Sequence, residues 1–293
     1  ALTALFIAQQ SMLLSVVASD ITGVTGNNGV YNINPSTAKG DIGFRHYENF
    51  NLSKGDIANL IYKYGATDIE TFVNMVDNQI NINGLVNTMR NNNFYNGKAV
   101  FISPNGMVVG ASGVLNVGSL GVYTPNSTDY NNFNKENPTI AGLNNLTKSD
   151  ANGAAPVTIN GKVISSGDVE IIGGKVDIGK NAGIIGGVNK SQMKALTSDD
   201  QATALFNNLV NTNNLTNGSQ FISDEAGQIR ITSQGGVNVA GNIINYATGG
   251  DYTNPNSSNY SGIKILSHNS STPNGDILSL IHISEPTRLR CIS

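Results

Sequence analysis

His46 is the residue whose type and neighbours come nearest to catalytic chemistry. It lies between Arg45 and Tyr47, and a histidine can act as a general acid or base near neutral pH. Such work needs partners, yet neither a serine elbow nor a His-Glu-x-x-His motif accompanies it. We therefore expect His46 to be a packed, hydrogen-bonded residue, and we predict no catalytic residue in this chain.

Acidic residues offer a second kind of chemistry. Asp168, Glu170 and Asp177 alternate with apolar residues, and polysaccharide-cleaving β-helices gather carboxylates for calcium binding or acid/base work. Outward carboxylates on short strands are usually only solvated, and the pair Asp199-Asp200 suits the first turn of a helix. The calcium-binding repeat Gly-Gly-x-Gly-x-Asp is absent. We predict no metal site and no cofactor, and we keep a secreted β-helical polysaccharide lyase or hydrolase as the alternative function.

The elements that carry these carboxylates are short alternating strands, each introduced by glycine. Their spacing is too short for crossover helices and too regular for a random sandwich, and it indicates a parallel β-helix with three strands in a coil of about twenty residues. We predict an all-β protein in which one face of these strands fills a single shared core. The predicted inward residues are Val169, Ile171, Val176, Ile178, Ile229, Ile231, Val237 and Val239.

The composition agrees with a chain made of strands and tight corners. It contains 33 glycines and no tryptophan, and asparagine makes up about one residue in seven, well above ordinary usage. Both residue types tolerate the positive φ angles that corners use, and stacked asparagines can pair along the helix axis. The formal net charge is −3 and no run of lysine or arginine occurs, so nucleic acid is excluded as a partner.

Two stretches interrupt the strand pattern. Ser198 can cap a helix whose apolar positions, Ala202 to Leu209, recur with helical spacing. This segment is predicted to be a helical excursion from the coil. Residues 124–155 are polar, rich in asparagine and contain proline, so we predict a long surface loop there.

The two ends of the chain differ in amino-acid composition from the middle. Residues 1–18 are apolar and end in Val16-Val17-Ala18, which fits the cleavage region of a signal peptide whose beginning is missing. The alternative is a first core strand or helix. Residues 278–293 abandon the asparagine and glycine style, and the stretch LSLIHISEPTR back-translates into an adapter used in sequencing libraries. We therefore predict a sequencing artefact there, which would remove Cys291, the only cysteine, and with it any disulfide or thiol chemistry.

Two longer stretches, residues 32–60 and 84–121, carry specific motifs. The first contains His46 and the segment Asn49-Phe50-Asn51-Leu52, and the second contains Ser103-Pro104-Asn105-Gly106 followed by two Val-Gly steps. They resemble the secretion domain of filamentous haemagglutinin-type adhesins exported by two-partner secretion, and most of all the leukotoxin-family filamentous adhesins. Ser103 stands where that family usually has asparagine, and residues 49–52 match its Asn-Pro-Asn-Leu motif only in part.

The resemblance implies a fold, a partner and a location. The family's domain is a right-handed parallel β-helix with an N-terminal cap and side hairpins, recognised by a dedicated outer-membrane transporter. For this chain it implies a secretion domain over residues 19–125, with the β-helix continuing over residues 126–277 with a loop and a helical insertion. The implied product is a large exported adhesin or toxin carrier at the bacterial surface. It would bind host or neighbouring cells through repeats that this sequence lacks.

The same resemblance assigns candidate site residues. Ser103, Pro104, Asn105 and Gly106 would form the turn that the transporter recognises, and Asn49, Phe50, Asn51 and Leu52 would form a secondary motif. A purely structural reading of the first motif is also open, because proline favours the second position of a turn and glycine supplies a positive φ angle.

Overall fold

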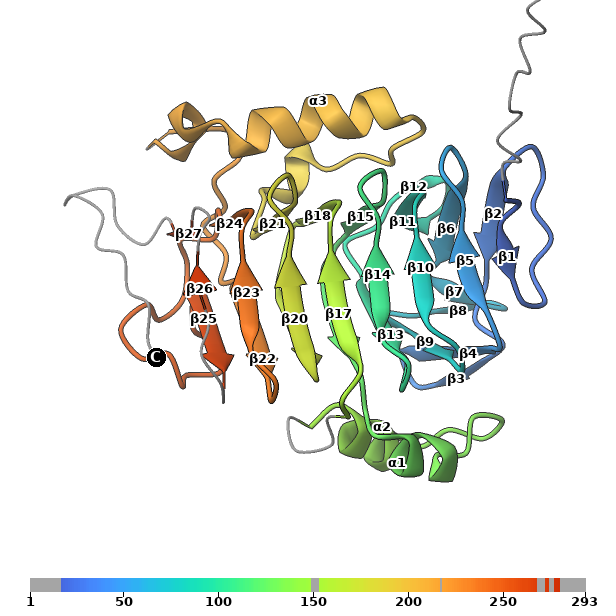
Figure 1. The fold of residues 1–293 in the computed structure, drawn as a ribbon. Coiled ribbons are helices and arrows are strands. Elements are labelled where there is room, and N and C mark those ends of the chain that lie inside the picture. Colours follow the sequence, from blue (N-terminus) through green and yellow to red (C-terminus); the bar gives the residue numbers. More distant parts are fainter. Residues whose placement is uncertain (1–16, 149–152, 217, 268–271, 274–276, 280–293) are drawn as a thin grey trace, which may run out of the picture.

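Short strands stack into three parallel sheets around one shared core (Figure 1). The structure is a computed structural model, and it describes residues 17–148, 153–216, 218–267, 272–273 and 277–279. The chain visits sheets A, B and C in turn, so each coil contributes one strand to each sheet. Val157 lies beside Val176 in sheet A, which gives an uninterrupted coil of 19 residues. The predicted all-β parallel β-helix with three strands per coil is confirmed.

Each sheet is a row of strands from successive coils. Sheet A contains β1 (Asp20–Ile21), β5 (Phe50–Leu52), β10 (Ile80–Ile82), β14 (Met107–Val109), β17 (Pro156–Ile159), β20 (Lys175–Ile178), β23 (Val237–Val239) and β26 (Thr272–Pro273). Sheet B contains β2 (Val30–Ile33), β6 (Ile57–Ile61), β11 (Leu85–Arg90), β15 (Val114–Val117), β18 (Lys162–Ser165), β21 (Gly183–Gly186), β24 (Asn242–Asn245) and β27 (Ile277–Ser279). Sheet C contains β3 (Thr37–Lys39), β4 (Ile42–Tyr47), β9 (Thr71–Val76), β13 (Lys98–Ile102), β16 (Ser119–Tyr123), β19 (Val169–Gly173), β22 (Gln228–Ser233) and β25 (Gly262–Ser267).

The core lies between the three sheets and is filled by one face of each strand. All eight residues predicted to point inward belong to this single apolar cluster, and none is more than 2% exposed. A strand of three to six residues is too short to be stable alone, so burial against the other two sheets and stacking on the neighbouring coils stabilise it. The prediction of one shared core is therefore confirmed.

Antiparallel strands close the N-terminal end of the helix. β1 pairs antiparallel with β5, and β3 pairs antiparallel with β4. Two hairpins also leave the coil, one made by β7 (Lys63–Tyr64) with β8 (Thr67–Asp68), the other by β12 (Asn93–Phe94) folding back on β11. The cap and the side hairpins expected from the resemblance are thus present in the fold.

The first excursion, residues 124–155, contains two short helices, and the prediction of a surface loop was incomplete. These are α1 (Ser127–Asn132) and α2 (Ile140–Leu146). Each begins at a capping side chain, Asn126 or Thr139, which accepts a hydrogen bond from the helix backbone. They lie against sheet C because their few apolar residues, among them Tyr130 and Leu143, pack on its outward side chains.

The second excursion, residues 187–227, contains the predicted helix. It is α3 (Asp199–Val210), flanked by the 3-10 helices η2 (Lys190–Gln192) and η3 (Thr212–Leu215). Ser198 caps α3 as predicted, since its hydroxyl accepts a hydrogen bond from the Gln201 amide. Figure 1 shows α3 lying along the helix axis above sheet B.

The two predicted terminal segments fall mostly outside the described residues. The predicted signal peptide, residues 1–18, is described only at its last two residues. Leu278 and Ser279 belong to β27, which pairs with β24 in parallel, whereas the rest of the predicted adapter tail, residues 280–293, lies outside the described part. The processing and the origin of these segments therefore stay predictions.

Candidate functional site

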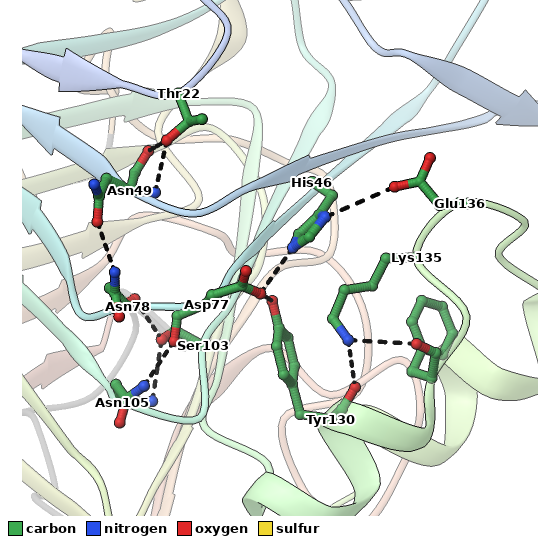
Figure 2. A network of polar contacts seen from close by, with 11 residues as sticks. Thr22, His46, Asn49, Asp77, Asn78, Ser103, Asn105, Tyr130, Lys135 and Glu136 are labelled. Atoms are coloured by element: carbon green, nitrogen blue, oxygen red, sulfur yellow. Dashed lines mark hydrogen bonds and ion pairs between the residues drawn. The ribbon is translucent and has the colours of Figure 1, made fainter.

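The two sequence motifs meet at one corner of the β-helix. Three successive coils pass there from sheet C to sheet A, through turns at residues 48–49, 77–79 and 103–106. We call these three turns the motif corner (Figure 2). Residues 49–52 lie on the first of these coils and residues 103–106 on the third, so the parallel stacking brings together motifs that are far apart in the sequence.

The first motif divides between the corner and the core. Asn49 donates through Nδ2 to Asp20 Oδ2 at 2.9 Å, and its backbone amide donates to Thr22 Oγ1 at 2.9 Å, which ties the corner to the cap. Phe50 and Leu52 are fully buried in the core. Asn51 faces outward and accepts a hydrogen bond from Asn81 Nδ2 on the next coil at 2.8 Å.

The second motif is a tight turn built on the preceding coil. Ser103 is buried and donates through Oγ to the Asn78 carbonyl at 2.8 Å, while the same oxygen accepts from the Asn105 amide at 3.1 Å. Asn105 is exposed, yet its Nδ2 donates to the Asp77 carbonyl at 2.6 Å. Gly106 has φ +84°, and a Cβ there would lie 2.2 Å from the Pro156 carbonyl oxygen, so only glycine fits.

Asn78 joins the two motifs, and the sequence analysis missed it. Its Nδ2 donates to Asn49 Oδ1 at 2.8 Å, and its carbonyl accepts from Ser103. A hydrogen-bonded chain therefore runs from Asn49 through Asn78 to Ser103 across three coils (Figure 2). The signal that could have found Asn78 is its separation of 29 residues from Asn49, close to the 30 that separates the paired Asn51 and Asn81.

Asp77 links the motif corner to the first excursion. Its carboxylate Oδ1 lies 2.7 Å from His46 Nε2 and accepts from the Tyr130 hydroxyl at 3.0 Å. Burial and the nearby charge of Asp77 raise the pKa of Tyr130 well above its usual range. His46 is hydrogen-bonded, as expected, and its Nδ1 lies 4.0 Å from Glu136 Oε1.

Lys135 adds a positive charge beside this contact. Its ammonium group lies 4.2 Å from the centre of the Tyr130 ring and donates to the Tyr130 carbonyl at 2.8 Å. Burial lowers the pKa of Lys135, although the carboxylate of Asp77 opposes this effect. Polar and charged side chains from β4, the motif corner and the excursion therefore gather on one small surface.

The carboxylates considered for polysaccharide cleavage each have a separate partner. Glu170 on sheet C accepts from the Tyr123 hydroxyl at 2.6 Å, and Asp177 on sheet A lies 3.6 Å from Lys175 Nζ. Asp168 accepts from the Gln228 amide. Within the described residues no three histidine, cysteine or acidic side chains are grouped so that they could hold a metal ion. These side chains act as separate surface and turn contacts.

Comparison with known proteins adds no identification. No protein-family model, curated protein or solved structure matches this chain. Among the described residues, no helix is both long and apolar enough to cross a membrane. A function can therefore be proposed only from the motif corner and from the residues that resemble the two-partner secretion family.

Proposed function

We propose that residues 19–125 are the secretion domain of a large exported adhesin, recognised by a dedicated outer-membrane transporter. The observation that carries this proposal is the motif corner, where the two motifs lie on stacked coils and are joined through Asn78. Within the turn, Ser103 accepts a hydrogen bond from the Asn105 amide and Gly106 supplies the positive φ angle. The additional exposed Asn105 gives a partner protein a polar side chain to bind at the same place.

Under this proposal residues 103–106 act twice. The transporter recognises them first, and they close the turn afterwards. In the folded domain Asn105 Nδ2 is already bonded to the Asp77 carbonyl, so a transporter would meet this amide before the corner closes. An unfolded, strand-forming chain can be held by addition to a sheet edge. After release the same side chain closes the corner and stabilises the next coil, which begins the stacking of the helix.

The N-terminal cap supports a role as the starting point of a longer helix. Antiparallel strands β1 and β3 cover the first parallel strands of sheets A and C, whereas the strands at the opposite end, β25, β26 and β27, all pair in parallel. The opposite end therefore suits the stacking of further parallel coils. The proposed location is the bacterial surface after export through the periplasm. The proposed second partner is a host or neighbouring cell surface, bound by repeats outside this sequence.

The experiment compares export with stability after the substitution Asn105→Ala. The chain is co-expressed with the transporter encoded beside its gene, and the exported fraction is measured together with the melting curve of the purified protein. Ser112→Ala is the matched control, because Ser112 on the same coil also donates one hydrogen bond to a carbonyl of the preceding coil, that of Asn83 at 2.7 Å. Each change should cost about 1 kcal/mol of stability.

We expect Asn105→Ala to accumulate in the periplasm while Ser112→Ala is exported normally. Equal export of the two variants would leave Asn105 with a structural role only. A genome that encodes no such transporter beside this gene would count against the whole proposal.

A further inference from the structure

A ladder of four asparagines crosses the outward face of sheet B. Asn59 donates through Nδ2 to Asn32 Oδ1 at 3.0 Å, Asn87 to Asn59 at 3.1 Å, and Asn116 to Asn87 at 2.9 Å. The four residues occupy equivalent positions in β2, β6, β11 and β15. Each amide in the ladder therefore keeps the same orientation relative to the sheet.

Two of these asparagines, Asn87 and Asn116, bind the backbone of an extended segment of this chain. Asn87 Nδ2 donates to the Leu196 carbonyl, and the Leu196 amide donates to Asn87 Oδ1, both at 2.9 Å. Asn116 Nδ2 donates to the Lys194 carbonyl at 2.7 Å. We call residues 193–198 the strap. The side chain of Leu196 packs on the apolar residues beside the ladder, Leu85 and Val114.

The other two asparagines of the ladder, Asn59 and Asn32, are not covered by the strap. The strap ends at Ser198, which caps α3, and the chain then turns away along the helix. Asn59 is half-exposed and Asn32 is exposed. Figure 1 shows β6 and β2 beyond the end of α3.

Asn59 presents the same pair of groups that Asn87 uses to bind Leu196. Within the ladder Asn59 uses one N–H toward Asn32 and accepts one bond from Asn87. An amide has a second N–H and a second acceptor position. The apolar row beside the ladder also continues, because Ile57 is the neighbour of Leu85 in register and Val30 is the neighbour of Ile57. Both are partly exposed, and Ile57 packs on one side against the cluster that contains Leu85 and Leu196.

We propose that Asn59 and Asn32, with Ile57 and Val30, bind an extended segment of another polypeptide. Asn59 pairs with the N–H and C=O of one residue of that segment, and Ile57 contacts its apolar side chain, as Asn87 and Leu85 do for Leu196. The occupant is thus a peptide backbone with an apolar residue, on the same ladder that the strap already occupies. The proposal does not depend on the proposed role in secretion.

The test is a titration of the full-length, ¹⁵N-labelled protein with the peptide Met-Lys-Ala-Leu-Thr-Ser, which copies the strap. We expect the side-chain amide signals of Asn59 and Asn32 to shift to saturation. Asn51 and Asn81, which form an outward pair on sheet A, serve as the internal control and should not shift. A peptide methylated on the leucine amide nitrogen lacks the N–H that Asn59 would bind, so it should bind at least about fivefold more weakly.

Two variants keep the test independent of folding. Asn59→Ala removes the proposed contact but also interrupts the ladder, whereas Ile57→Thr leaves the ladder intact and reduces only the apolar contact. Both should weaken binding, and Asn51→Ala should not. The proposal is overturned by unshifted Asn59 and Asn32 signals, by equal shifts on sheet A, or by shifts confined to Asn87 and Asn116, which would mean exchange with the strap. Shifts caused by raising the protein concentration alone would assign the site to a second copy of this chain.

Discussion

The two excursions from the coil are attached to it by different kinds of contact. The first excursion, residues 124–155, packs Tyr130 and Phe133 on sheet C, but it also reaches Asp77 and His46 through hydrogen-bonded and charged groups. The second, residues 187–227, packs Phe206 and its neighbours on an apolar row of sheet B. Both attachments include burial, but the first adds contacts to the charged Asp77, whereas the second adds uncharged hydrogen bonds from Asn87 and Asn116 to the strap.

This difference has a consequence for the motif corner. The same residue, Asp77, accepts the Asn105 side chain through its carbonyl and the Tyr130 hydroxyl through its carboxylate. Release of the first excursion would therefore change the surroundings of the corner. The second excursion packs on sheet B, whereas the corner joins sheets C and A, so its release should leave the corner unchanged.

The largest expected effect is on the apolar attachment. Phe206→Ala should cost about 3 kcal/mol, because the ring packs closely on Gly183, where an added Cβ would lie 2.6 Å from it. Urea unfolding measures the loss of stability. Limited proteolysis of the Phe206→Ala variant should cut α3 first. Asn207→Ala, at an exposed neighbouring position, is the control and should change stability by less than about 0.5 kcal/mol. An unchanged melt for Phe206→Ala would mean that α3 is not held by this ring.

The next effect is a response of the first excursion to alkaline pH. Burial and the charge of Asp77 raise the pKa of Tyr130 above its usual range, whereas a tyrosine in the unfolded chain ionises near 10. The stabilising contribution is therefore complete below about pH 10 and is lost above it, by up to about 1.4 kcal/mol per pH unit for each such tyrosine. The free energy of unfolding measured from pH 9 to pH 11 should fall accordingly.

Tyr130→Phe is the control that separates this residue from other buried tyrosines. Tyr47, Tyr62 and Tyr123 also have raised pKa values, chiefly through burial, and they contribute to the same fall. The variant should lose about 1 kcal/mol at neutral pH, and its stability should fall less steeply above pH 10. Identical slopes for the two proteins would contradict the ionisable attachment.

The smallest expected effect concerns the start of α3. Ser198→Ala removes the oxygen that accepts from the Gln201 amide at 3.2 Å and should cost about 1 kcal/mol or less. Faster hydrogen exchange in the first turn of α3 would report it. Ser198→Asp keeps a capping oxygen and should restore the parent rate. If both variants exchange alike, the cap is not what fixes this end of the helix.

Features that depend on neighbouring residues along the chain could be predicted from the sequence. The alternation Val169-x-Ile171 placed both side chains in the core, and the spacing from Ala202 to Leu209 together with Ser198 indicated α3. Such patterns repeat within a few residues, so local physical chemistry decides them.

Features that depend on how the coils stack could not be predicted. The helices of the first excursion have 6 and 7 residues, too few for a clear apolar period, and tertiary contacts such as Tyr130 with Asp77 hold them. The rungs of the asparagine ladder are separated by 27, 28 and 29 residues. This spacing differs from coil to coil, so the ladder does not follow from a fixed period.

The connections between sheets C and A also show how long an insertion between two strands of this β-helix can be. One coil crosses from sheet C to sheet A through residues 103–106, and the next makes the same crossing through residues 124–155, while the strands on both sides keep their parallel register. A connection about eight times as long costs only about 2 kcal/mol more in loop-closure entropy. The crossing between β16 and β17 is therefore a natural place to graft a new domain, because the stacked strands rather than the connection fix the position of the next coil.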